Sequence, residues 1–132
     1  MAINIRVIAT DRTVWDAQGE EVILPSISGQ IGILNNHAPL LTALDIGIMR
    51  VRANNEWVNI VVSGGFAEIE NNDLTVLVNE AEKASFIDVN EAQKELEAET
   101  LNFNQTVTSK EKVDATQRLR RAKARVQAAL DK

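Results

Sequence analysis

Residues able to carry out acid–base or metal chemistry are scarce in this chain. Its single histidine, His37, would need an orienting carboxylate and a nucleophile to act as a general base, and the sequence identifies neither. The chain has no cysteine, which excludes disulfides and thiolate metal sites, and one histidine does not supply the ligands of a zinc site. We therefore interpret His37 as a turn or docking residue, and we predict no catalytic residue, no metal site and no enzymatic activity.

Four glycines raise the separate question of a phosphate-binding loop: Gly29, Gly32, Gly64 and Gly65. Their spacing matches neither the G-x-G-x-x-G fingerprint nor a P-loop, and the chain contains no G-K-[ST] sequence. Turn and bulge glycines in a β-structure explain them better. Because residues 28–47 combine such turn residues with short apolar runs, we interpret them as a docking segment.

The charged residues are distributed unevenly and indicate a partner. Residues 110–132 hold eight basic and three acidic side chains, which gives a net charge of +5. The rest of the chain holds six basic and sixteen acidic side chains, which gives a net charge of −10. Few acids on the same segment relieve this repulsion, so we predict an acidic partner. Nucleic acid fits poorly because the remainder is acidic and the basic segment has no aromatic residue for stacking. Lipid insertion is also not expected, because the segment is rich in alanine and lacks bulky apolar residues.

Hydrophobic residues alternate with period two up to about Val78, which is typical of half-buried strands. The asparagine pairs at 54–55 and 71–72 suit hairpin turns, where asparagine tolerates positive φ. Many short strands separated by turns favour an antiparallel sandwich or a flattened barrel. The predicted strands are residues 3–9, 21–24, 32–34, 40–44, 48–53, 57–62, 66–70 and 74–78.

After Ser85 the period becomes helical. Asp88 is the predicted N-cap of a first helix, with Glu91 in its first turn, and residues 108–111 form a capping box that opens a second. We place a polar turn at residues 102–108. The apolar stripes are narrow and rich in alanine, so burial contributes little. We therefore expect this helical hairpin to pack against the sandwich, or against a partner, with a small free-energy difference between the two.

The predicted fold is α+β: an antiparallel β-sandwich of about ten short strands at residues 1–84, followed by a two-helix antiparallel hairpin at residues 88–132. Three segments of the sequence resemble the ε subunits of F-type ATP synthases, especially those of cyanobacteria and plastids. They are residues 29–44 (G-Q-I-G-I-L-N-N-H-A-P-L-L-T-A-L), 48–52 (I-M-R-V-R) and 63–69 (S-G-G-F-A-E-I). The resemblance runs over essentially the whole chain.

This resemblance implies a rotor subunit of the central stalk. The sandwich would bind the γ subunit and the membrane rotor ring, with Ser28, Gly29, Gln30 and His37 as docking contacts. The hairpin would inhibit ATP hydrolysis by extending toward the α and β subunits of the catalytic head. The implied inhibitory contacts are Arg118, Arg120, Arg121, Lys123 and Arg125. The alternative is a purely structural coupling subunit whose hairpin has no inhibitory role.

Some members of the family bind ATP through an Ile/Leu-Asp-x-x-Arg-Ala motif at the start of the first helix. Here Ile87, Asp88 and Ala92 match that motif, but Glu91 replaces its arginine. Because a carboxylate repels a triphosphate, we expect weak ATP binding at most and no required cofactor. The chain begins directly with a strand-like pattern and shows no targeting segment. We expect a peripheral membrane protein on the cytoplasmic or stromal face of a thylakoid or another energy-coupling membrane.

Overall fold

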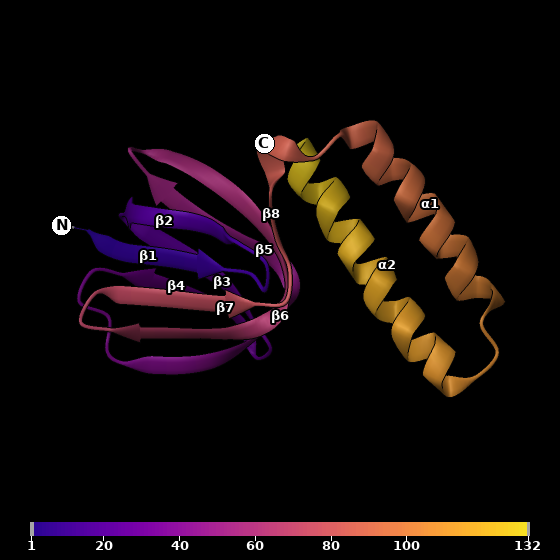
Figure 1. Cartoon of the computed structure of the whole chain (residues 1–132), viewed down its shortest axis with the longest axis horizontal. Helices are drawn as coiled ribbons and strands as arrows, with labels where there is room; N and C mark the ends of the chain where they lie inside the picture. Colours follow the sequence, from indigo (N-terminus) through magenta and orange to yellow (C-terminus); the bar gives the residue numbers. More distant parts are fainter. Residues whose placement is uncertain (1, 132) are drawn as a thin grey trace.

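The computed structural model describes residues 2–131 and shows a β-sandwich with a helical hairpin projecting from one end (Figure 1). None of its helices combines the length and hydrophobicity that a membrane crossing needs. The strands are β1 (Ile3–Ile8), β2 (Thr13–Gly19), β3 (Glu21–Ser26), β4 (Gly29–Leu34), β5 (Leu40–Ala53), β6 (Glu56–Glu70), β7 (Asp73–Val78) and β8 (Ala81–Lys83). A 3-10 turn, η1 (Ala84–Phe86), leads into the helices α1 (Val89–Gln105) and α2 (Ser109–Leu130).

Alternating hydrophobic residues form the strands as predicted. In β1, Ile3, Ile5 and Val7 are buried, whereas Asn4 and Arg6 face solvent. The asparagine pairs also lie where expected: residues 54–55 connect β5 to β6, residues 71–72 connect β6 to β7, and all four have positive φ. Such φ values match the twist of two-residue hairpin turns.

The described strands number eight, close to the predicted ten or so. Two pairs of the predicted segments are each one continuous strand, and two observed strands were not predicted. Residues 40–44 and 48–53 belong to β5, and residues 57–62 and 66–70 belong to β6. Gly64 and Gly65 have φ of +72° and +139°, so β6 changes direction there without ending. The period-two pattern did not reveal β2 or β8.

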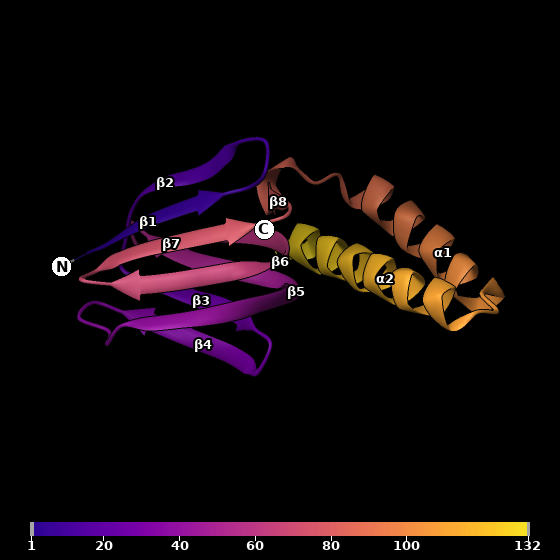
Figure 2. The same cartoon turned by 60° about the horizontal axis from the view of Figure 1, so that its bottom comes forward.

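The sheet follows the order β2-β1-β7-β6-β5-β3-β4, with β8 paired to the first half of β6 (Figure 2). All neighbouring pairs are antiparallel except β1 and β7, which are parallel. These two strands are far apart in sequence, so no tight hairpin dictates their relative direction. Because β6 pairs with β8 at one end and with β7 at the other, it extends through both layers of the sandwich.

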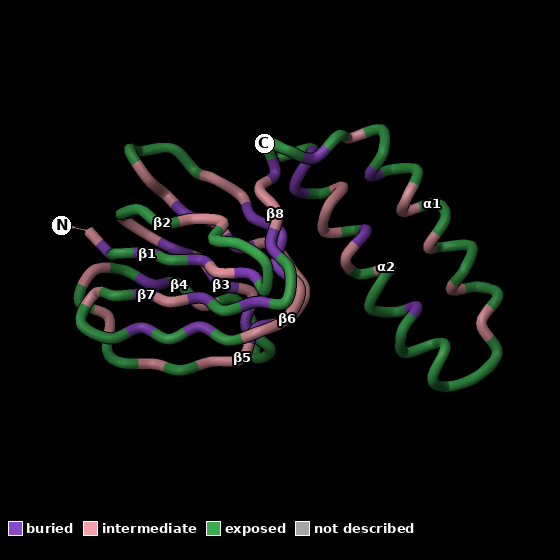
Figure 3. Tube along the Cα trace, in the orientation of Figure 1, coloured by how far each residue is buried: buried purple, intermediate pink, exposed green. Residues whose placement is uncertain are grey.

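The main core lies inside the sandwich, and its buried residues all fall between Ile3 and Ala81 (Figure 3). The largest fully buried side chains include Met49, Ile60 and Leu74. No residue of either helix belongs to this cluster. The sandwich therefore has a complete hydrophobic core without the hairpin.

The helix N-caps form as predicted: the side chains of Asp88 and Thr108 accept hydrogen bonds from the backbone N–H groups of Glu91 (3.1 Å) and Glu111 (3.2 Å). The predicted polar turn at residues 102–108 is wrong in extent. Helix α1 continues to Gln105, and only residues 106–108 connect the helices. Polar side chains on a solvent-facing helix surface do not end the helix.

Candidate interaction site on the basic helix

Helix α2 packs through small side chains. As expected for a narrow, alanine-rich stripe, Ala115, Ala122 and Ala129 are buried, whereas Leu119 and Val126 on the same stripe are half-buried. The C-terminal part of α2 packs in a second cluster that joins the hairpin to the sandwich, and the hairpin tip points away from the strands (Figure 1). The buried residues of this second cluster are Val61, Ala84, Ile87, Ala92, Ala128 and Ala129. Four of the six are alanines, so the cluster buries little apolar surface.

The arginines of α2 pair with acids that lie on other elements of the same chain. Arg120 contacts Asp45 of β5, with 2.7 Å between Nη2 and Oδ2. Arg121 contacts Glu80, just before β8, at 2.8 Å. Arg118 contacts Glu99 of α1 at 3.2 Å.

Arg125 has the most enclosed charge of the helix, with 16% of its side chain exposed. It bonds both carboxylate oxygens of Glu82 on β8, at 2.9 Å from Nε and 3.2 Å from Nη2, and also bonds Glu95 of α1. These carboxylates raise the pKa of Arg125, and the hydrogen bond to Glu82 contributes most. The guanidinium is therefore charged at any physiological pH.

The predicted requirement for acidic partners is thus met within the chain in this arrangement. Lys123 is the exception, because it is exposed and makes no ion pair with residues 2–131. No sequence pattern singled out the acids themselves: Asp45, Glu80, Glu82, Glu95 and Glu99. The excess of acidic residues outside residues 110–132 indicated that such partners exist. Their separations of 19 to 75 residues from the arginines, however, follow no local spacing.

Asp45 makes the docking of α2 sensitive to acid. Its hydrogen bond with Arg120, the backbone N–H of Ile46 and the positive charge of Arg120 hold its pKa below the ordinary 3.8. The part of this lowering that comes from Arg120 stabilises the docked form fully above the ordinary pKa, and this contribution is lost as the pH falls through the lowered value. The effect is small, because Arg120 and Asp45 are both more than a third exposed.

We expect an NMR titration of the Asp45 carboxyl carbon to give a pKa below 3.8, and Arg120→Gln to move it upward. A pKa for Asp45 that is the same with and without Arg120 would show that this pair does not form.

The predicted docking residues do not share one end of the sandwich. Ser28 and Gly29 lie at the β3–β4 turn, where Gly29 pairs with Ser26, and Gln30 follows them on β4. His37 follows the opposite end of β4, where its ring Nδ1 bonds the carbonyl of Ala38 at 2.6 Å. It borders an open hollow of about 350 Å³ together with Asn36, Pro39, Asn71 and Asn72.

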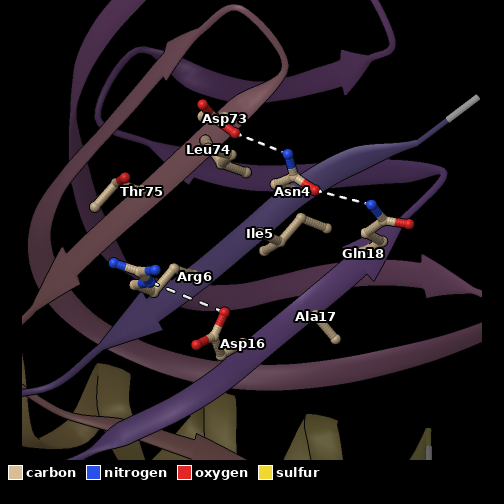
Figure 4. A pocket seen from close by; sticks show the side chains of 9 residues that line it. All are labelled: Asn4, Ile5, Arg6, Asp16, Ala17, Gln18, Asp73, Leu74 and Thr75. Carbon is tan, nitrogen blue, oxygen red and sulfur yellow. Dashed lines mark hydrogen bonds and ion pairs between the residues drawn. The ribbon is translucent and has the colours of Figure 1, made fainter.

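Another hollow, of about 520 Å³, lies on the outer face of β1, β2 and β7 (Figure 4). Asn4 bonds Asp73 at 2.8 Å and Gln18 at 3.0 Å, and Arg6 lies 3.9 Å from Asp16. These side chains link the three strands to one another, which reinforces the sheet. The basic helix and its acidic contacts therefore remain the better candidate site.

Comparison with known proteins agrees with this architecture. The family model for the ATP synthase delta/epsilon chain beta-sandwich domain matches residues 2–84. An ATP synthase epsilon chain from the chloroplast of Porphyra purpurea is 64% identical over 129 residues, covering 98% of this chain and 96% of that protein. The chain belongs to the ATP synthase epsilon chain family. An epsilon chain of the cyanobacterium Thermosynechococcus vestitus is 55% identical, covering 98% of this chain and 96% of that one.

Solved structures show that the fold extends over both parts of this epsilon-family chain. A chain of the Euglena gracilis mitochondrial ATP synthase, in an OSCP/F1/c-ring assembly, superposes with a TM-score of 0.84 at 21% identity. The match covers 98% of this chain and 81% of that one. The sandwich and hairpin are thus arranged as in a known protein despite low identity.

The residues that match the family's ATP motif have structural roles here. Ile87 is buried in the second cluster, as is Ala92, and Asp88 caps α1. Glu91, where the motif has arginine, is exposed and supplies the capped N–H group. Ile87 and Ala92 thus belong to the junction between hairpin and sandwich, and Asp88 fixes the start of α1.

Proposed function

We propose that this chain is a non-catalytic central-stalk subunit of a proton-translocating F-type ATP synthase. In this role it couples rotation of the membrane ring to the catalytic head, and it inhibits ATP hydrolysis through its basic C-terminal helix. The sandwich contacts γ and the ring of c subunits, and the hairpin reaches the α and β subunits. The chloroplast and cyanobacterial relatives favour the stromal or cytoplasmic face of a thylakoid membrane.

The unequal attachment of the hairpin carries the inhibitory part of this proposal. The sandwich has its own complete core, whereas the hairpin docks through the alanine-rich second cluster, two exposed ion pairs and the Arg125–Glu82 pair. Small buried surfaces and exposed ion pairs each contribute little free energy. The hairpin can therefore leave the sandwich without unfolding it, as a two-state regulatory element must.

Deleting residues 88–132 tests this function in the assembled enzyme. We expect ATP hydrolysis to rise several-fold while ATP synthesis and co-purification with γ are retained, because the main core ends at Ala81. The measurements are ATPase activity and proton-driven ATP synthesis in membrane vesicles. Unchanged hydrolysis with normal assembly would instead support the purely structural coupling role.

A further inference from the structure

Arg125 joins three elements, of which β8 would separate from the two helices if the hairpin moved as a unit. Arg125 lies on α2. It donates hydrogen bonds to both carboxylate oxygens of Glu82 on β8, and it also donates one to Glu95 of α1. A guanidinium and a carboxylate that pair through two parallel hydrogen bonds make one of the stronger polar contacts in proteins. Glu82 and Glu95 are themselves about two-thirds buried, with 29% and 32% of their side chains exposed.

The other ion pairs of α2 do not have this combination of burial and connectivity. Arg118 and Glu99 join only the two helices, so their contact survives if the hairpin moves as a unit. Arg120 and Arg121 do reach the sandwich, but 46% and 41% of their side chains are exposed. Solvent screening makes such exposed pairs weak.

The apolar contacts around Arg125 are too small to dominate docking. The buried members of the second cluster are mainly alanines, with Val61 and Ile87 the larger ones. Larger side chains pack against it while only partly buried: Ile48, Val89 and Val126. Hydrophobic stabilisation scales with buried apolar area, so this junction gains little from it. The charged contacts consequently have more influence on docking here than they would beside an ordinary core.

Docking also determines which cations a partner can reach. While Glu82 and Glu95 hold Arg125, its hydrogen-bond donors are not available to an acidic surface of another subunit. Two groups that compete for one cation are thermodynamically linked, so weakening one strengthens the other. Lys123 is exposed, and among residues 2–131 it is the only one of the five predicted contacts without a carboxylate partner.

We propose that Glu82 and Glu95 are internal competitors for Arg125, and that this three-residue clamp sets the fraction of hairpin available to an acidic partner. The inference rests on the proposed function only for its consequence in the enzyme. In this proposal Arg125 stabilises the docked hairpin, in addition to any contact that it makes with the catalytic head. The docked hairpin is thereby stabilised by residues of the chain itself, with no ligand required.

The test is the double variant Glu82→Gln and Glu95→Gln in the full-length isolated chain. Glutamine keeps the shape of glutamate but removes its charge, which leaves a mostly buried guanidinium uncompensated in the docked form. We expect backbone amides of α2 to exchange hydrogen about tenfold faster, on the scale of losing hydrogen bonds to a charged group. The amides of β1, β5 and β7 should exchange as in the unchanged chain.

The matched control is Glu97→Gln, which removes one carboxylate from α1. Glu97 is exposed and makes no ion pair within residues 2–131, so its replacement should leave α2 exchange unchanged. If the double variant exchanges no faster than this control, the clamp does not hold the hairpin and the inference is wrong.

A second readout separates this inference from the proposed function. In the assembled enzyme, the double variant should hydrolyse ATP more slowly, because more hairpin is free to inhibit. Faster α2 exchange with unchanged hydrolysis would support the clamp and contradict the inhibitory role. Unchanged α2 exchange would overturn the clamp whatever happens to hydrolysis.

Discussion

Replacing Gly65 with alanine is expected to destabilise the whole sandwich. Gly65 has φ of +139°, and an added Cβ would lie 2.1 Å from the carbonyl oxygen of Leu77 and 2.7 Å from the Cα of Val78. Both contacts are with the backbone of β7, which cannot rotate away. Backbone strain of about 1–3 kcal/mol and overpacking of about 1–3 kcal/mol predict a loss of about 2–6 kcal/mol in the free energy of unfolding.

This loss is large compared with the stability of a typical domain, so a partly unfolded population is expected. Circular dichroism during guanidinium unfolding measures the effect. Gly32→Ala is the matched control, because a Cβ at Gly32 meets no atom within 4 Å. It should change the free energy of unfolding by less than about 1 kcal/mol, the usual range for exposed strand positions. Equal midpoints for the two variants would show that β6 does not need glycine at residue 65.

Replacing Ala122 with leucine is expected to loosen the hairpin selectively. Ala122 is fully buried on the stripe of α2, and leucine adds three carbon atoms where no space is available. Overpacking of this kind costs about 1–3 kcal/mol. Because the second cluster contributes little, we expect this cost to raise amide exchange throughout α2. The sandwich should keep its unfolding midpoint, since Ala122 lies outside the main core.

Lys123→Leu provides the comparison for Ala122→Leu, because it introduces the same side chain at the next, exposed position of the same helix. It should leave α2 exchange close to that of the unchanged chain. Similar acceleration in both variants would point to leucine itself, and not to the packing of Ala122, as the cause. A lower unfolding midpoint for the sandwich in Ala122→Leu would contradict the independence of the two parts.

Local patterns were sufficient for most of the elements. Alternation of apolar residues predicted β1 and β7, asparagine pairs predicted two hairpin turns, and Asp88 and Thr108 predicted both helix starts. These features depend on residues close in sequence, so a sequence pattern can reveal them. The end of α1 was harder to predict, because a helix ends where tertiary packing and capping allow, and polar residues can remain helical up to Gln105.

Longer-range features could not be predicted in the same way. Strand β6 continues past Gly64 and Gly65 because β5 pairs with it from Ala53 back to Leu40, and glycine alone signals only a bend. The parallel pairing of β1 with β7 has no local pattern at all. For the candidate site, the residues of the basic helix were found from sequence, whereas their acidic contacts were not.

A basic, alanine-striped helix follows an acidic β-structure, and the residue types alone establish that this helix needs carboxylates to offset its charge. Net charge and helical periodicity are properties of the chain that do not depend on how it folds. The identity of those carboxylates depends on the fold. Folding brings Glu82 and Glu95 to Arg125, and Asp45 to Arg120, across 30 to 75 residues of sequence. Coulomb attraction acts through space, so its partners become known only once the fold sets the distances.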